Sequence, residues 1–384
     1  MSLTLFSDKP SNHTLSVIFL IDMTIEERLL NLLERRKAAG NWRSLQYKAH
    51  LIDFCSNDYL SLARLEAPST SNKAGSTGSR LLSGHYPLLE QLEHLLQDFH
   101  RAEAALVLNS GYSANLSLLS AIPRRSDIIL YDSLIHASMH DGLKLSAAPA
   151  IAFPHNDLEH LKQLLQTHQG KTVFVLVESI YSMDGDAAPL LEMVDLCQHY
   201  QAYLVVDEAH STGCYGNYGE GLCCALGIEK AVFARIHTFG KAVGAYGAAI
   251  LGSTTLRHFL INYARPFIYT TAPSPYTVER VLWAYQQLQQ YGTHWIEELQ
   301  ERITFFRTNL PNSSTALYSQ SAIQSILIPG NEAVVACSHA LEAQGFDVRP
   351  IRRPTVAAGS ERLRICLHRH NSLTEIATLL KALA

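Results

Sequence analysis

The stretch HTFGK (237–241) places a hydroxyl and an amine at a spacing that suits one pocket. Thr238 and Lys241 are three positions apart, so one helical turn could direct both side chains to the same side. A lysine that is desolvated in such a pocket has a lowered pKa and becomes a usable nucleophile. The alternative is a solvated lysine on a glycine-rich loop.

An acidic residue ends another apolar run upstream of Lys241. In LVVDEAH (204–210), Asp207 ends the run and His210 follows three positions later. Taken alone, this pair could be a helix-capping aspartate and a buried, hydrogen-bonded histidine. Together with Lys241, however, Asp207 supplies what pyridoxal phosphate (PLP) requires, because a carboxylate keeps the pyridine nitrogen protonated while a lysine forms the Schiff base. We therefore expect PLP as the cofactor.

Other apolar runs also end in polar residues. One ends in NSGY (109–112), where a Ser-Gly turn opens a helix; free amides at a helix N-terminus suit a phosphate, although this signal is weak on its own. Another run leads to Asp132 and His136, which could equally be a helix cap and a surface histidine. A third ends at Glu178 and continues to Ser182.

These residues need a scaffold that brings the run ends together. Continuous apolar runs alternate with longer amphipathic stretches, which predicts a mostly parallel sheet between helices. Ligands of such sheets bind beyond the carboxyl ends of the strands. The predicted strands are Ala105–Leu108, Asp127–Tyr131, Val173–Val177, Tyr203–Val206, Val232–Ile236 and Ala248–Leu251. The predicted helices are Pro87–His100, Ser133–Leu145, Leu158–Gln166 and Leu190–Tyr200.

From Ser274 onward the pattern changes to a smaller α+β unit. We expect helices at 274–291, 293–310, 332–344 and 373–383, and strands at 325–328 and 363–367. The predicted domains are an N-terminal extension and helix (1–54), a large PLP-binding α/β domain (55–275) and a small C-terminal α+β domain (276–384).

Composition excludes several classes of protein. The 384 residues are 47% hydrophobic and 17% charged, which is too apolar for a disordered chain, and the net charge of −4 gives no sign of a nucleic-acid surface. The seven cysteines include no CxxC pair, which argues against a disulfide scaffold or a zinc site and favours the reducing cytoplasm. The apolar stretch 15–21 is too short to span a membrane. Residues 1–22 are uninformative and could precede a natural start at Met23.

Nine motifs, in order, resemble the α-oxoamine synthase family of PLP enzymes, which have the fold-type I (aspartate-aminotransferase-like) architecture. The resemblance runs from Arg43 to the C-terminus. The motifs are DFCSNDYLSL (53–62), GSTGSRLLSGHYPLLEQLE (75–93), LNSGYSAN (108–115), DSLIHAS (132–138), ESIYSMDGD (178–186), VVDEAHSTGCYG (205–216), HTFGKAVGAYGAAI (237–250), ARPFIYTTAPSP (264–275) and RPTVAAGSERLRI (353–365).

The resemblance implies a role for each matching residue. Lys241 would be the Schiff-base lysine, Asp207 the partner of the pyridinium nitrogen and His136 the ring that stacks on the cofactor. Ser182 and His210 would contact the ring oxygen. The phosphate would be held by Gly111, Tyr112 and Thr238, with Thr270 and Thr271 reaching in from a second subunit. The substrate would be held by Arg43, Asn57, Thr355 and Arg364, the last binding the carboxylate of the amino acid.

The resemblance also implies a reaction and its partners. We expect a homodimer that condenses L-alanine with a pimeloyl thioester, carried by coenzyme A or by a carrier protein, with loss of carbon dioxide. Relatives use glycine or serine with other acyl thioesters, and those pairs remain alternatives. The segments 44–52 and 63–74 are shorter than is usual in the family, which bears on Arg43 and on thioester entry.

Two hypotheses from other functional classes compete with this reaction. A non-catalytic scaffold subunit of the same family would lack the Schiff-base lysine, whereas Lys241 is present. A nicotinamide-dependent dehydrogenase would need GxGxxG directly after a strand, but GSTGSR (75–80) follows no predicted strand.

Overall fold

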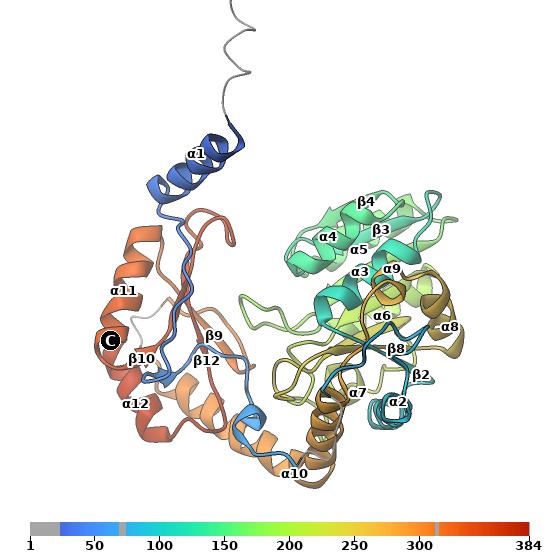
Figure 1. Cartoon of the computed structure of the whole chain (residues 1–384). Helices are drawn as coiled ribbons and strands as arrows, with labels where there is room; N and C mark the ends of the chain where they lie inside the picture. The colour runs from blue at the N-terminus through green and yellow to red at the C-terminus, as the bar shows by residue number, and fades with distance from the viewer. Residues whose placement is uncertain (1–23, 69–73, 312–314, 384) are drawn as a thin grey trace, which may run out of the picture.

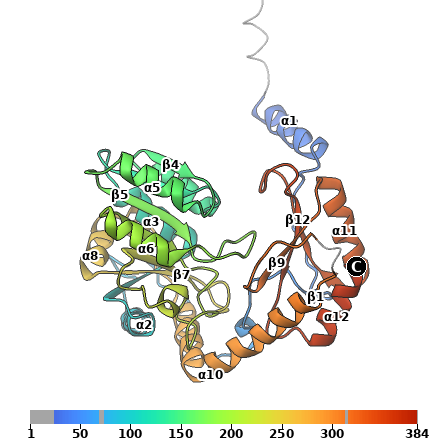
Figure 2. The same ribbon diagram turned by 180° about the vertical axis from the view of Figure 1, so that it is seen from behind.

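The computed structural model describes residues 24–68, 74–311 and 315–383. Two lobes are joined by the long helix α10 (Pro275–Thr308), and helix α1 (Ile25–Ala38) lies apart from both (Figure 1). The reverse view shows the same separation (Figure 2). The interpretation of residues 1–22 falls outside the described residues.

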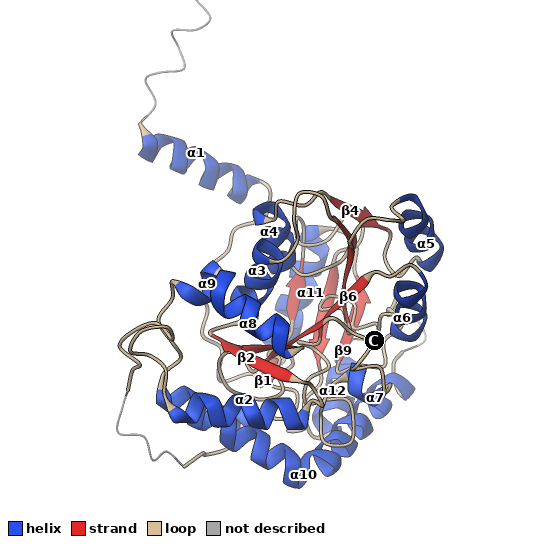
Figure 3. Cartoon of the chain, turned by 90° about the vertical axis from the view of Figure 1, so that its right-hand side faces the viewer, coloured by secondary structure: helices blue, strands red, loops and turns tan. Residues whose placement is uncertain are grey.

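A seven-stranded sheet forms the centre of the larger lobe (Figure 3). Its strand order is β2-β8-β7-β6-β5-β3-β4, and β8 alone runs antiparallel to its neighbours. The predicted, mostly parallel sheet is therefore confirmed. The strands are β2 (Ala104–Leu108), β3 (Ile128–Asp132), β4 (Ala150–Phe153), β5 (Val173–Glu178), β6 (Tyr203–Asp207), β7 (Ala234–Thr238) and β8 (Ala248–Gly252).

Helices cover both faces of this sheet. Successive residues of a strand point to opposite faces, so Leu106 packs with the helices of one face and Val107 with those of the other. One face carries α3 (Gly111–Ala121), α4 (Ala137–Leu145), α8 (Thr254–Tyr263) and α9 (Arg265–Ile268). The other carries α2 (Pro87–Phe99), α5 (Leu158–Thr167), α6 (Leu190–His199), α7 (Leu222–Ala225) and part of α10. Burial on both sides explains the continuous apolar runs.

The smaller lobe is an α+β unit. Its antiparallel sheet has the order β11-β12-β9. Its elements are β9 (Ile323–Leu327), α11 (Asn331–Ala343), β10 (Phe346–Asp347), β11 (Arg349–Ile351), β12 (Arg362–Cys366) and α12 (Leu373–Ala382).

An N-terminal segment also packs on the smaller lobe. Strand β1 (Ile52–Asp53) pairs in parallel with β10, and the amide of Cys366 donates to the carbonyl of Phe54 (2.9 Å). A short 3₁₀ helix, η2 (Leu62–Arg64), follows. The domain boundaries at 54/55 and 275/276 stay predictions. Residues 52–61, which lie on both sides of the first boundary, contact the C-terminal unit.

Several elements differ from the sequence-based expectation, and α10 and β4 show two reasons for this. The helices expected at 274–291 and 293–310 are one helix, α10, which runs through Gly292. A Cβ atom at Gly292 would lie 2.5 Å from the carbonyl oxygen of Tyr218, so this glycine permits a close approach rather than ending a helix. Strand β4 was not predicted, because it is short and exposed along most of its length.

Among the described residues, none of the helices combines the length and the apolar character that crossing a bilayer demands. All seven cysteines are free thiols, and five of them are buried.

Candidate active site

Strands β5, β6 and β7 end side by side, and their last residues carry polar side chains. Glu178 of β5 is in register with Asp207 of β6, and Thr238 ends β7. The buried Asp207 carboxylate accepts two hydrogen bonds, one from the amide of Ala209 to Oδ1 (3.0 Å) and one from Asn115 Nδ2 to Oδ2 (2.8 Å). Both oxygens of this carboxyl group are therefore held by protein donors.

Asn115 is a residue of this site that the sequence reasoning did not single out. It lies on α3, is buried, and donates to Ser138 Oγ (3.0 Å) as well as to Asp207. A usable signal was present, because Asn115 follows Gly111 by four positions and therefore lies on the same face of the helix. Without the fold, nothing showed that this face meets the end of β6.

Lys241 lies three positions beyond the end of β7, in a loop closed by the amide of Gly244 donating to its carbonyl (2.8 Å). Burial lowers the pKa of the Lys241 amine, while the Asp207 carboxylate, and Glu178 when it is ionised, act in the opposite direction. The amine is therefore easier to deprotonate than a solvated lysine.

The N-terminus of α3 and the end of β7 form a small polar cradle. A Cβ atom at Gly111 would lie 2.5 Å from Thr238 Cγ2, so glycine is needed for this close approach. Thr238 Oγ1 is buried and has no partner in the described part of the chain. The first amides of a helix have no intrahelical acceptor and attract an anion. The phosphate of PLP fits this combination of donors.

Two more predicted residues flank the cradle. Tyr112 is exposed on α3, and its hydroxyl donates to Asp141 of α4. His136 caps the N-terminus of α4, with its Nδ1 accepting from the amide of Ser138 (3.2 Å). Partial burial lowers the pKa of His136, the Asp207 charge opposes this, and the Lys241 charge adds to it. A neutral ring is therefore available beside Asp207 and Lys241.

His210 lies three positions after Asp207 and is buried. Its Nδ1 is 2.8 Å from the hydroxyl oxygen of Tyr59, which also donates to Asn57 Oδ1 (3.0 Å). Burial lowers the pKa of His210 to well below its usual range. This histidine connects the PLP-side residues to the N-terminal segment.

Arg364 of β12 brings three distant segments together. Its Nε donates to the carbonyl of Ser182 (2.6 Å), and its Nη2 donates to Asn57 Oδ1 (3.0 Å). Its Nη1 reaches Cys366 Sγ (2.9 Å), a weak acceptor. The arginine is buried, and protein atoms hold all three nitrogens of its guanidinium group.

Two predicted substrate residues lie in exposed segments instead. Arg43 is exposed in the segment between α1 and β1. Thr355 is exposed in the loop between β11 and β12, where its amide donates to the carbonyl of Arg352 (2.9 Å). Neither has a hydrogen bond to the other predicted site residues within the described ranges.

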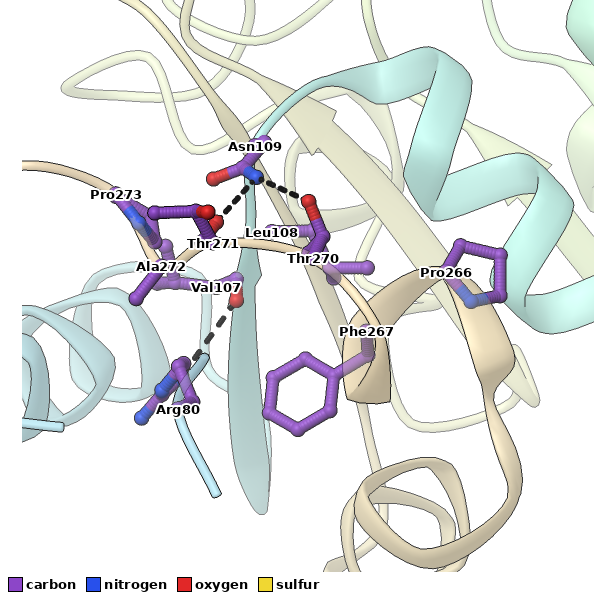
Figure 4. A pocket seen from close by; sticks show the side chains of 10 residues that line it. All are labelled: Arg80, Val107, Leu108, Asn109, Pro266, Phe267, Thr270, Thr271, Ala272 and Pro273. Atoms are coloured by element: carbon purple, nitrogen blue, oxygen red, sulfur yellow. Dashed lines mark hydrogen bonds between the residues drawn. The ribbon is translucent and has the colours of Figure 1, made fainter. Parts of the chain in front are cut away.

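Thr270 and Thr271 lie beside the end of β2 of their own chain (Figure 4). Asn109 Nδ2 donates to Thr270 Oγ1 (3.2 Å) and to the carbonyl of Thr271 (2.8 Å). Both threonines line a pocket together with Arg80 and Phe267. Their contribution to a second subunit stays a prediction.

Comparison with known proteins relates this geometry to a family. The sequence profile of the family described as aminotransferase class I and II matches residues 49–383. The chain is 39% identical to the 8-amino-7-oxononanoate synthase of Emericella nidulans over 364 residues, which cover 87% of this chain and 88% of the relative.

Solved structures give the same relationship. A serine palmitoyltransferase from S. paucimobilis, solved with PLP and myriocin bound, is 26% identical with a TM-score of 0.81, covering 93% of this chain and 96% of that one. The 8-amino-7-oxononanoate synthase of Francisella tularensis is 29% identical with a TM-score of 0.71, covering 86% of this chain and 96% of that one. The predicted fold type and the resemblance to α-oxoamine synthases are confirmed.

Proposed function

This chain belongs to the aminotransferase class I and II family, and from that membership we propose that it joins L-alanine to a pimeloyl thioester. The products would be 8-amino-7-oxononanoate, carbon dioxide and the free thiol, a step of biotin biosynthesis. The observation that carries the proposal is the convergence of Lys241, Asp207 and the Gly111–Thr238 cradle at one sheet edge in a chain whose relatives carry this name.

The cofactor is PLP, which fits the donors of the site. When bound, it supplies an electron-withdrawing ring that stabilises negative charge at the α-carbon of an amino acid. The amides at the start of α3 and Thr238 Oγ1 would hold its phosphate. Asp207, held by Asn115 and by the amide of Ala209, would hold a proton on the ring nitrogen. His136, neutral at physiological pH, would stack on the ring, and Ser182 and His210 would contact its oxygen.

Arg364 and Asn57 would bind the carboxylate of L-alanine. A guanidinium group has the fork geometry that matches a carboxylate, and Arg364 is already fixed by Ser182 and Asn57. The bond from Nη1 to Cys366 Sγ is the weakest of its contacts, so a carboxylate would replace that sulfur at low cost.

Lys241 would act as the general base. Its amine, whose pKa burial lowers, can take the α-proton of the bound alanine and later return a proton to the product. His136 lies where it could also polarise the new ketone. Arg43 and Thr355, both exposed, would contact the acyl thioester as it enters.

A second candidate function uses serine with a long-chain acyl thioester. The structural neighbour with a TM-score of 0.81 is a serine palmitoyltransferase, and it covers more of the chain than the Francisella synthase does. The higher sequence identity of the Emericella synthase favours the alanine reaction.

The enzyme would work as a cytoplasmic homodimer. Seven free cysteines suit a reducing compartment. Helix α1 exposes a row of apolar side chains, including Leu29, Leu30 and Leu33, which a second subunit would cover.

The test is a substrate comparison with the purified, PLP-loaded chain. L-Alanine, glycine and L-serine are each paired with pimeloyl, acetyl and palmitoyl coenzyme A, and thiol release is measured. The highest kcat/KM should belong to L-alanine with the pimeloyl thioester. A higher value for serine with palmitoyl coenzyme A would support the second candidate, and no release with any pair would contradict both.

A further inference from the structure

Glu178, the last residue of β5, is a buried carboxyl group that the reaction outlined above does not use. It is 2% exposed and lies in register with Asp207 of the neighbouring parallel strand. Residues in register on parallel strands point to the same face, and such strands lie about 4.8 Å apart. Two carboxyl groups therefore meet at the site where Lys241 must act.

Hydrogen bonding treats the two carboxyl groups differently. Both oxygens of Asp207 accept a bond from the protein, whereas Glu178 Oε1 is buried without a partner in the described chain. An unpaired oxygen is costly on a buried carboxylate and much less so on a neutral acid. The proton of the pair is therefore best held by Glu178.

The charges around Glu178 point the same way. Burial has the largest effect, the anions of Asp207 and Asp132 add to it, and together they raise the pKa of Glu178 to about 8. The Lys241 amine and a hydrogen bond from the backbone of Ser182 oppose this rise without cancelling it. Two like charges so close in a buried site are not both ionised.

We propose that Glu178 is a positioning residue that remains a neutral acid at physiological pH and leaves Asp207 as the only anion beside Lys241 among the described residues. This inference deepens the proposed function and rests on it for its catalytic consequence. A second anion would stabilise the ammonium form of Lys241 and so hinder the amine from taking a proton. Loss of the Glu178 proton at alkaline pH should therefore reduce turnover.

The protonation state can be observed without catalysis. Infrared spectroscopy of the full chain carrying ¹³C-labelled glutamate follows the C=O stretch of protonated carboxyl groups as pH rises. The wild type should keep one such glutamate band up to about pH 8, and E178Q should lack it. In D207N the band should vanish at lower pH, because the neighbouring anion is gone. A band unchanged in E178Q, or unmoved in D207N, would overturn the inference.

The pH profile of turnover supplies the second readout. E178Q mimics the neutral acid, so its kcat at neutral pH should stay within about threefold of the wild type. Its alkaline decrease near pH 8 should disappear. An E178Q profile with the wild-type decrease would overturn the inference.

Glu208→Gln is the matched control. Glu208 is equally buried and also has an unpaired oxygen, but that oxygen lies 4.0 Å from Nη1 of Arg235, so a cation compensates its charge. This variant should keep the wild-type pH profile. The infrared measurement tests only the protonation state of Glu178 and does not depend on the proposed function. A wild type without condensation activity would instead contradict the proposed function.

Discussion

Single buried polar groups determine what this site can do. Lys241 is desolvated, the Thr238 hydroxyl has no hydrogen-bond partner among the residues that the structure describes, and the Asp207 carboxylate is held by Asn115. A buried polar group is costly without a partner, so we expect a bound ligand to complete the hydrogen bonding of these groups. The chemistry of a charged, phosphorylated aromatic cofactor meets all three requirements.

Lys241→Ala tests the base directly. The variant should lose at least about a thousandfold in kcat, because both the cofactor-linking amine and the general base disappear. Its thermal unfolding without added cofactor should stay close to that of the wild type, since the cost of burying the amine disappears together with the side chain. The exposed Lys171→Ala is the control. Condensation at wild-type rates in the Lys241 variant would refute the proposed mechanism.

Arg364→Lys tests the carboxylate site. A lysine keeps the charge but loses the fork, so KM for L-alanine should rise about ten- to a hundredfold while KM for the thioester changes little. Arg369→Lys, an arginine of the same lobe that lies over Trp295, is the control and should leave both values unchanged. An equal rise in both KM values would show a general loss of structure instead.

The connection from β5 to α6 links the two lobes. Arg364 bonds to the Ser182 carbonyl, Arg362 pairs with Asp184, and Ser319 Oγ donates to the Gly185 carbonyl (2.9 Å). His155 holds the base of this connection through Asp186 (2.8 Å) and also contacts Asp132 at the end of β3 (3.0 Å). One histidine thus fixes the segment that carries Ser182 to the site.

The stability contributed by His155 should depend on pH. Burial disfavours its charged form, but the hydrogen bonds that its ring donates to the Asp132 and Asp186 carboxylates, together with their charges, outweigh burial and raise its pKa to about 9. Since the folded pKa is raised, the contribution is complete below the unfolded value of about 6.5 and is lost as pH rises through about 9.

Urea unfolding of the wild type and His155→Gln at several pH values measures this contribution. The difference in the free energy of unfolding should be about 1 to 2 kcal/mol at pH 6, allowing for solvent screening of this partly exposed ring, and should shrink above pH 9. His50→Gln, at an exposed position, should show no such trend. A difference that grows with pH would contradict the assignment.

The molecule as a whole consists of two lobes that contact each other through Arg364 and the carbonyl of Ser182, with α10 passing from one lobe to the other (Figure 1). Two surface features support the predicted homodimer. Helix α1 has no buried residue, and the Thr270–Thr271 segment lies at a surface pocket beside Asn109.

Sedimentation velocity tests this expectation. The purified chain should sediment as a dimer, at about twice the mass of 42.6 kDa, because the apolar row of α1 is left uncovered in one chain. A concentration series separates a stable dimer from a weak one. A monomer at every concentration would contradict the homodimer.

Much of the fold follows from local patterns in the chain. The runs that became β2, β5, β6 and β7 were recognisable because burial on both faces demands uninterrupted apolar residues. Asp207 and Lys241 could be identified as a pair because parallel strands place their carboxyl ends at one edge. The nine motifs then indicated the resemblance to the α-oxoamine synthase family.

Long-range pairing was decided only in three dimensions. Arg364 meets Ser182 and Asn57, which lie 182 and 307 positions away, and hydrophobic periodicity specifies which face is buried but not what it is buried against. The hydrogen bond from Asn115 to Asp207, the lack of a hydrogen-bond partner for Glu178 Oε1 in the described chain and the continuous helix through Gly292 have the same origin. Residue types and their spacing determined the chemistry, while packing of distant segments determined its geometry and its proton affinities.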